Sequence, residues 1–275
     1  MRPFGPSKGK PGRLSGPGRI LGHHRLRPLP LDPAPRTLSM PGYQTKQECV
    51  AIAGAADLQI RSLLDRQQFS DPLHAAERLG ITSASWPLFG LLWPSGAYLA
   101  ARMAAHVLQP GQRILEVGCG LGLASLVAHR RGADMTASDR HPLAAPFLAA
   151  NLQLNLLPPM KYCHGDWDLA AVAGLAAQPV VTLRYELIIG SDVLYDRDAS
   201  TALAGFIDRH ATAASEVWIV DPDRGNRPAF SRAMAALGYA LLQTRLQAQA
   251  SAGVAAFKGR LLQYTRASPR VAAAA

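Results

Sequence analysis

One ten-residue stretch, 114–123, constrains the fold of this chain more than any other feature. Its sequence, Ile-Leu-Glu-Val-Gly-Cys-Gly-Leu-Gly-Leu, joins an apolar run to three glycines at alternate positions, and an alanine-rich apolar run follows. This pattern predicts a buried strand that turns sharply into a helix. Glycines let the backbone N–H groups of such a turn approach a ligand more closely than residues with a Cβ would. We therefore expect an α/β fold with a nucleotide-type site at this turn.

The spacing of the glycines narrows the choice of ligand. A dinucleotide fingerprint, G-x-G-x-x-G, would require glycine at Leu123, and a phosphate-binding loop would require G-K-[ST], which is absent here. The pattern present is E-x-G-x-G-x-G, formed by Glu116, Gly118, Gly120 and Gly122. It resembles motif I of class I S-adenosylmethionine (SAM) methyltransferases, and this resemblance implies SAM as the cofactor.

The formal net charge of +10 is spread unevenly along the chain. Residues 1–39 hold eight Lys or Arg and one Asp, and residues 257–275 hold four Lys or Arg and no acid. The remainder holds 17 basic and 18 acidic residues, so the expected folded part is nearly neutral. Nucleic-acid binding is therefore expected only through the basic tails, and a nucleic-acid-binding protein of that kind is one alternative function.

Cysteine spacing and hydropathy indicate the redox compartment of the protein and whether it spans a membrane. Cys49, Cys119 and Cys163 show no CxxC or Cys/His spacing, which favours a reducing compartment and no structural metal. No apolar run approaches the roughly 18 to 20 residues that span a bilayer. We expect a cytoplasmic protein without a membrane partner.

The first 45 residues differ in composition from the rest of the chain. They are rich in Pro, Gly and Arg and have no hydrophobic period, which predicts a disordered basic tail. Their excess of Arg resembles that of a transit peptide, but repeated Pro and Gly oppose the amphipathic helix that such a peptide needs. Alternatively the segment is a linker or reflects an upstream start codon, with Met40 as the functional start.

Residues 46–110 are expected to form a helical extension. The pattern from Asp57 to Gly80 predicts one or two helices, with Asp71-Pro72 as a start and Gly80 as a stop. A dense apolar and aromatic stretch at 86–94 precedes a further predicted helix at 95–108.

Residues 111–268 alternate between strand and helix patterns. Such alternation predicts a Rossmann-like, doubly wound sheet, mostly parallel, with helices on both faces. A short connection at 248–253 predicts a final hairpin and one antiparallel strand. Seven strands with a reversed hairpin match the sheet of class I methyltransferases. The strands are expected near 112–117, 133–138, 160–164, 185–191, 215–221, 239–246 and 255–265.

Acidic residues stand at the ends of four successive predicted strands, where ligands bind in open α/β sheets. Glu116 ends the first strand and is expected to orient the glycine loop; the resemblance implies that it faces the cofactor's amino group. Asp139 ends the second strand, where a carboxylate can accept both ribose hydroxyls. Asp166 follows the third strand and Asp192 the fourth.

Neighbouring residues complete the expected cofactor site. The resemblance implies that Asp166 and Trp167 lie near the adenine, and that Ser191 lies beside the methionine part of SAM. A sulfonium cation favours aromatic neighbours, so Trp93 is a further candidate. The alternatives are that Asp139 and Asp166 cap the following helices, and that Trp86 and Trp93 belong to the core. The expected cofactor-binding residues are Trp93, Glu116, Gly118, Gly120, Gly122, Asp139, Asp166, Trp167 and Ser191.

Further motifs between residues 80 and 240 resemble a narrower family. They are Leu92-Trp93-Pro94-Ser95-Gly96, the pair Asn151 and Asn155, and Asp192-Val193-Leu194-Tyr195-Asp196. Together they resemble the family 16 seven-strand lysine methyltransferases. Asp221-Pro222-Asp223-Arg224 resembles the D-P-x-R turn of the electron-transfer-flavoprotein β-subunit lysine methyltransferase type and its bacterial relatives. A plain β-turn with a surface ion pair is the alternative for this turn.

The D-x-x-Y segment points to the acceptor. Methyltransferases of planar nitrogens carry [ND]-P-P-[YFW] at this position, whereas Val193 and Leu194 replace both prolines here. This favours an aliphatic amine, most simply a lysine of a protein substrate. Asp192 is expected to bind and aim the nitrogen, and Tyr195 to add a hydrogen bond or a channel wall. A helix cap with a packed tyrosine is one alternative, and N-methylation of a small amine or heterocycle is another.

Overall fold

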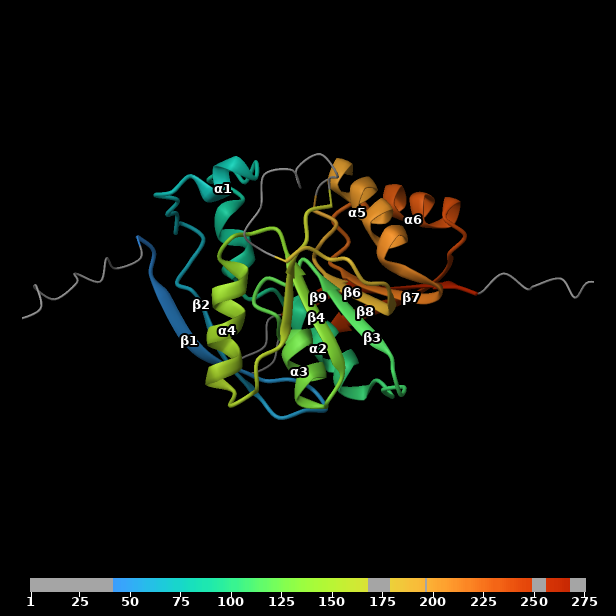
Figure 1. Cartoon of the computed structure of the whole chain (residues 1–275), viewed down its shortest axis with the longest axis horizontal. Helices are drawn as coiled ribbons and strands as arrows, with labels where there is room; N and C mark the ends of the chain where they lie inside the picture. The colour runs from blue at the N-terminus through green and yellow to red at the C-terminus, as the bar shows by residue number, and fades with distance from the viewer. Residues whose placement is uncertain (1–41, 168–178, 196, 249–255, 268–275) are drawn as a thin grey trace, which may run out of the picture. The chain divides into compact units, whose positions relative to one another are not determined.

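The computed structural model describes residues 42–167, 179–195, 197–248 and 256–267 (Figure 1). The tail expected over residues 1–45 therefore lies almost entirely outside the described residues. So do most of the predicted hairpin connection at 248–253 and much of the segment between the third and fourth predicted strands.

A seven-stranded sheet forms the centre of the fold, in the order β5-β4-β3-β6-β7-β9-β8. Strand β9 is antiparallel to both of its neighbours, and the other pairs are parallel. The predicted fold class and all seven strand positions are confirmed. The strands are β3 (Arg113–Val117), β4 (Asp134–Asp139), β5 (Lys161–His164), β6 (Tyr185–Ser191), β7 (Ala211–Asp221), β8 (Ala240–Ala248) and β9 (Phe257–Arg266).

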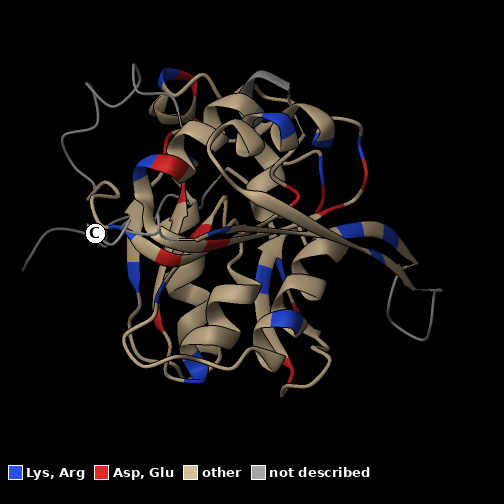
Figure 2. Ribbon diagram, turned by 90° about the vertical axis from the view of Figure 1, so that its right-hand side faces the viewer, with Lys and Arg blue, Asp and Glu red and all other residues tan. Residues whose placement is uncertain are grey.

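Helices cover both faces of the sheet, which Figure 2 shows nearly edge-on. Helices α2 (Pro94–Ala105), α3 (Leu123–Arg130) and α4 (Ala144–Leu154) pack on one face. Helices α5 (Arg197–His210) and α6 (Arg227–Ala236) pack on the other. Because side chains alternate along a strand, β3 contributes to both cores: Ile114 joins the first cluster and Leu115 the second.

The segment before the sheet contains a β-hairpin, so the helix predicted from Asp57 is wrong over its first half. Strands β1 (Thr45–Val50) and β2 (Leu58–Leu63) pair antiparallel. The physical reason is the period of burial, since Leu58 and Ile60 are fully buried while Gln59 between them is exposed. An alternation of two residues fits a strand and not a helix.

The helix boundaries expected further along this segment are present, but they enclose a short helix. The Asp71 carboxylate accepts the N–H groups of Ala75 and Glu77 at 2.8 and 2.9 Å, and α1 (Ala75–Arg78) follows. Gly80 ends the turn with a positive φ of 67°. A 3₁₀ helix, η1 (Trp86–Gly90), comes next. Its Trp86 is buried in the core, which confirms the core alternative for this residue.

Asn151 in α4 and Asn155, the C-cap residue of that helix, bind the edge of β2. The Asn151 side chain accepts the N–H of Arg61 at 2.8 Å, and the Asn155 side chain bonds both the N–H and the carbonyl of Gln59, at 3.0 and 2.8 Å. Residues from 46–110 and from 111–268 also share one hydrophobic cluster. The boundary expected at residue 110 therefore does not divide the core.

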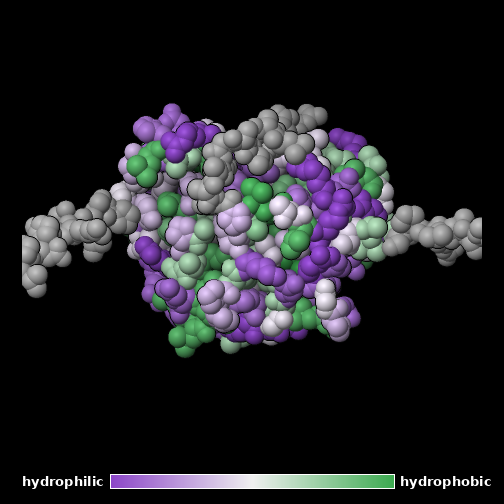
Figure 3. Space-filling model, viewed as in Figure 1, coloured by the Kyte–Doolittle hydropathy of each residue, from purple (hydrophilic) through white to green (hydrophobic). Residues whose placement is uncertain are grey.

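None of the helices that the structure describes has the length and apolar content to cross a membrane. On the face shown in Figure 3, hydrophobic residues form small groups among hydrophilic ones.

Candidate active site

A cavity of about 420 Å³ opens at the carboxyl ends of β3, β4, β5 and β6. Gly122 and Asp166 do not line it. Gly122 is instead the N-cap residue of α3, and Asp166 is buried between the lining residues Gly165 and Trp167. The predicted site residues that do line the cavity are Trp93, Glu116, Gly118, Gly120, Asp139, Trp167, Ser191, Asp192 and Tyr195.

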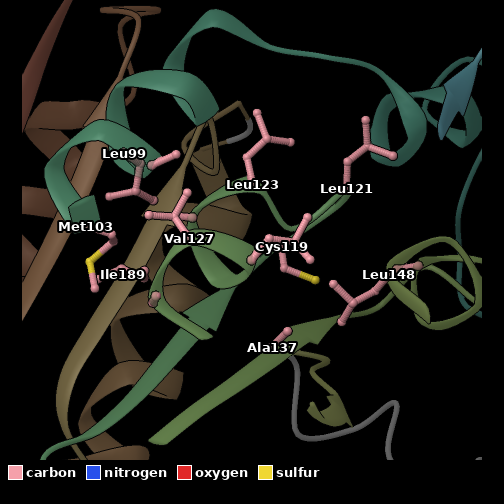
Figure 4. Close-up of a cluster of buried hydrophobic side chains, with 14 of the residues drawn as sticks. Leu99, Met103, Cys119, Leu121, Leu123, Val127, Ala137, Leu148 and Ile189 are labelled. Carbon is pink, nitrogen blue, oxygen red and sulfur yellow. The ribbon is translucent and has the colours of Figure 1, made fainter. Parts of the chain in front are cut away.

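The glycine loop has a conformation that other residues rarely adopt. Gly118, Gly120 and Gly122 have φ values of 59°, 51° and 74°. A Cβ on Gly120 would stand 2.7 Å from the backbone oxygen of Phe89, and one on Gly118 would stand 2.8 Å from Val193. Figure 4 shows the apolar side chains of this loop among buried residues from neighbouring elements. Neighbouring residues therefore pack against one side of the loop, and its other side faces the cavity.

Glu116 connects the two ends of the glycine loop. Its Oε2 accepts the N–H of Ser125 at 2.9 Å and also the Ser125 hydroxyl, which ties the end of β3 to the first turn of α3. The pKa of Glu116 is raised to about 7, chiefly by burial. The Ser125 hydrogen bonds partly oppose this rise, and the nearby Asp139 charge adds to it. This arrangement fits the loop-orienting role expected for Glu116, while its contact with the cofactor's amino group stays a prediction.

Asp139 is bonded to backbone on both carboxylate oxygens. Oδ2 accepts the N–H of Gly120 at 2.9 Å, and Oδ1 accepts the N–H of His141 at 2.8 Å. Burial raises the pKa of this carboxyl, and the two backbone hydrogen bonds lower it. Leu143, and not Asp139, is the N-cap residue of α4. Asp139 therefore braces the glycine loop against the end of β4 and does not cap the next helix.

His141 is a lining residue that sequence reasoning missed. The residue is 4% exposed, and its ring stacks on Phe89 with 3.7 Å between ring centroids. Nδ1 accepts the N–H of Leu143 at 3.2 Å, so the neutral ring carries its proton on Nε2. Burial lowers the pKa of His141 to about 3. A lone histidine after a strand carries no periodic signal that would have identified it.

Trp93 lines the cavity, and its contact with the cofactor stays a prediction. Its indole N–H donates to the carbonyl of Leu88 at 2.9 Å, which fixes the ring plane. Two guanidinium groups lie near the ring, those of Arg66 and Arg224, at 5.2 and 5.4 Å from its centroid. Trp93 is therefore outside the core, in contrast to Trp86.

Asp192 and Arg224 form an ion pair in the cavity wall. The guanidinium bonds both carboxylate oxygens, at 2.9 Å to Oδ1 and 3.1 Å to Oδ2, and the Ser95 hydroxyl donates to Oδ2 at 3.2 Å. Burial raises the pKa of Asp192, while Arg224 and then Ser95 lower it. The backbone of Asp192 is left-handed, with φ of 58°. The side chain of Asp192 is 10% exposed and that of Arg224 is 42% exposed, so the ion pair is buried on the aspartate side and open to solvent on the arginine side.

Tyr195 also lines the cavity and is 46% exposed, which contradicts the packed-tyrosine alternative. The turn that carries Arg224 is itself anchored. Asp223 pairs with Arg260 at 3.0 Å and with Arg227 at 3.3 Å. The Asn226 amide donates to the carbonyl of Leu194 at 3.0 Å, and so joins this turn to the D-x-x-Y segment.

The residues present fit SAM. The cavity has the size of a small-molecule site, and a Cβ at Gly118 or Gly120 would collide with Val193 or with the Phe89 carbonyl, so only glycine keeps this loop in place. The Glu116 carboxylate suits the amino group of SAM, and the Asp139 carboxylate suits the ribose hydroxyls. The Asp192 carboxylate suits the amine of the methyl acceptor. Among the residues that the structure describes, no group of three or more His, Cys, Asp or Glu side chains could hold a metal ion.

A family model described as lysine methyltransferase matches residues 88–229, more than half of the chain. The chain belongs to this lysine methyltransferase family. The matched residues include the glycine loop, the strand-end acids and the turn that carries Arg224. Family membership thus confirms the resemblance drawn from the motifs.

Two relatives and one solved structure illustrate the likeness. The chain is 28% identical to the electron transfer flavoprotein beta subunit lysine methyltransferase of Xenopus laevis, over 50% of this chain and 53% of that protein. It is 34% identical to the protein N-lysine methyltransferase METTL21A of Danio rerio, over 44% and 56%. A methyltransferase structure from Pyrococcus furiosus aligns with a TM-score of 0.49 at 15% identity, over 70% and 98%. The chain spans about half the length of the two curated relatives.

Proposed function

We propose that this member of the family transfers a methyl group from SAM to the ε-amine of a lysine in a protein substrate. The observation that carries the proposal is the placement of Asp192 and Tyr195 in one cavity with the glycine loop. An amine that reaches Asp192 is thereby close to the part of the cavity that suits the cofactor. The names of the two relatives support a protein lysine as the acceptor.

The residues between Asp192 and Tyr195 support an aliphatic amine. Val193 and Leu194 are 3% and 1% exposed and pack in the core, where an N-P-P-Y type loop would have two prolines. Such a core-anchored loop presents one carboxylate to the cavity and offers no arrangement for a planar amide. A lysine ammonium or amine can donate directly to that carboxylate.

Bound SAM supplies a methyl group on a positively charged sulfur. Asp192 accepts a hydrogen bond from the acceptor amine and aims its nitrogen, and Trp93 limits water at the mouth. Removing the proton of a lysine at pH 7 costs about 4 to 5 kcal/mol, at about 1.36 kcal/mol per pKa unit. Water takes this proton, and the amine then displaces the sulfur in line without a covalent enzyme intermediate.

The test is incubation of the purified protein with methyl-labelled SAM and a lysate from cells that lack it. Mass spectrometry of the labelled band should locate the methyl group on a lysine. Label confined to metabolites would contradict a protein acceptor and would favour the small-amine alternative. Label on arginine or on a planar nitrogen would contradict the role given to Asp192.

We also propose that the protein acts in the cytoplasm. The three cysteines are free, including the buried Cys119 in the glycine loop, and this supports a reducing compartment. Localisation of a tagged full-length chain by fractionation tests this proposal, and recovery from an oxidising compartment would contradict it.

A further inference from the structure

The carboxylate at the acceptor end of the cavity is paired with a guanidinium. Asp192 supplies one negative charge, and Arg224 matches it with two hydrogen bonds, at 2.9 and 3.1 Å. The uncharged Ser95 hydroxyl on α2 also donates to the carboxylate. Asp221, at the end of β7, is a second carboxylate that interacts with Asp192. It is 2% exposed, and its own carboxylate accepts the N–H of Asp223.

The pairing of Asp192 with Arg224 bears on the hardest part of lysine methylation. Only the free amine has the lone pair that attacks the methyl group, and a lone carboxylate next to the amine would hold it as ammonium. A fixed positive charge nearby has the opposite effect and favours the neutral amine. Arginine suits this task because it stays protonated at every physiological pH.

The structure holds the Arg224 guanidinium firmly beside the carboxylate. Its plane lies near the Trp93 ring, with 5.4 Å from its central carbon to the ring centroid. The turn beneath it is fixed by Asp223, which pairs with Arg227 and Arg260. The arginine is thus braced from two sides and lines the cavity.

We propose that Arg224 is a positioning residue that cancels the charge of Asp192, so that the acceptor lysine reaches the methyl donor as its free base. The inference rests on the proposed function. The ammonium gives its proton to water, and the neutral amine takes the methyl group while the sulfur keeps the bonding pair and leaves as S-adenosylhomocysteine. Asp192 is left to orient the amine as a hydrogen-bond acceptor.

The test is the pH dependence of kcat, which reports the ionisation of groups in the substrate complex. The acceptor is the protein fraction that wild-type enzyme labels in the lysate experiment, with SAM at saturation. In Arg224→Met the acidic limb of the kcat–pH profile should move to higher pH by about one unit. At a fixed pH on that limb, kcat of the variant should be about tenfold lower than that of wild type. This is the shift expected from a unit charge roughly 6 Å away at an effective dielectric constant of about 40.

Two further variants separate charge from structure. Arg224→Lys keeps the positive charge and should keep the wild-type limb within a few tenths of a unit. Arg260→Met removes an anchor of the same turn, the 3.0 Å contact with Asp223, without touching Asp192, and it should not move the limb. An unchanged limb in Arg224→Met, or an equal shift in Arg260→Met, overturns the proposal.

A measurement without turnover keeps this inference distinct from the proposed function. Carbon-13 NMR of aspartate carboxyls in the free protein should show Asp192 titrating at higher pH in Arg224→Met than in wild type, with Asp192→Asn used to assign the signal. Identical titration of Asp192 in the two proteins overturns the ion pair and with it the proposal. Absence of labelled protein with wild-type enzyme at any pH would count against the proposed function alone.

Discussion

The two ends of the cavity are built differently. The cofactor end is a glycine loop of left-handed backbone, braced by Glu116 and Asp139 through hydrogen bonds to buried N–H groups. The acceptor end is an ion pair between Asp192 and Arg224, and the side chain of Arg224 is 42% exposed. The first end depends on local backbone geometry, and the second on two loops that are distant in sequence.

This difference predicts which property of the protein a substitution at each end should change. A Cβ at Gly118 or Gly120 would stand less than 3 Å from a neighbouring atom, so changes there should reduce binding and stability together. A half-exposed ion pair contributes little to folding but sets the charge of the site. Changes at the acceptor end should therefore alter turnover and its pH dependence while the fold stays intact.

The largest effect is expected for Gly120→Ala. The new Cβ would lie 2.7 Å from the carbonyl oxygen of Phe89, and φ is 51°, so S-adenosylhomocysteine binding should fall at least about 100-fold and stability should drop by about 2 to 4 kcal/mol. Calorimetric titration and urea unfolding measure the two losses.

The matched control is Gly132→Ala, where φ is 84° but no atom lies within 4 Å of the new Cβ. It should lose only about 1 kcal/mol and keep its affinity. Equal losses in the two variants would contradict the packing argument for the glycine loop.

The next largest effect is expected for Asp192→Asn. Asparagine tolerates the left-handed backbone at this position and keeps the shape of the side chain. Turnover should fall about 100-fold because the amine is no longer aimed by a carboxylate, while affinity for S-adenosylhomocysteine stays the same. Rates at saturating SAM test this, and unchanged turnover with intact cofactor binding would remove Asp192 from the mechanism.

Glu116→Gln should separate stability from binding at the cofactor end. The pKa of Glu116 is raised from 4.5 to about 7, so ionisation of this buried group destabilises the folded protein as pH rises through that window. The stability of the variant relative to wild type should therefore increase by about 3 kcal/mol from pH 4.5 to pH 8. Urea unfolding at the two pH values measures the change.

The same variant should bind SAM about tenfold more weakly, because a neutral amide replaces a carboxylate that is expected to face the cofactor's amino group. A stability difference that does not change with pH would mean that Glu116 is not the buried acid described above.

The smallest effect is expected for Tyr195→Phe. The ring would keep its place in the channel wall, Tyr195 is 46% exposed, and a hydroxyl contributes about 0.5 to 1.5 kcal/mol through a hydrogen bond. The ratio kcat/KM should fall between about twofold and tenfold at constant cofactor affinity. A 100-fold loss would show that Tyr195 acts on the reacting nitrogen and not on the channel.

The cofactor end could be predicted because its signals are local. Alternating glycines after an apolar strand require a tight turn, and acids at strand ends meet at one edge of a parallel sheet. Glu116 and Asp139 follow from these rules without any tertiary information. The reversed last hairpin was also readable, since its two strand patterns are separated by only a few residues.

The parts that the sequence did not reveal depend on contacts between distant segments. Strand β2 is stabilised by Asn151 and Asn155, about 90 residues further along the chain, and a helical interpretation ignored the alternation of Leu58 and Ile60. The pairing of Arg224 with Asp192 spans 32 residues and joins two loops. No local period predicts which carboxylate an arginine will meet.

Calorimetric titration of the full chain with S-adenosylhomocysteine tests the central claim most directly. The account predicts heat of binding with one molecule per chain, and no detectable heat with Gly120→Ala under the same conditions. Absence of heat from the wild-type protein would contradict the assignment of the glycine-loop cavity as the SAM site, and with it the proposed methyl transfer.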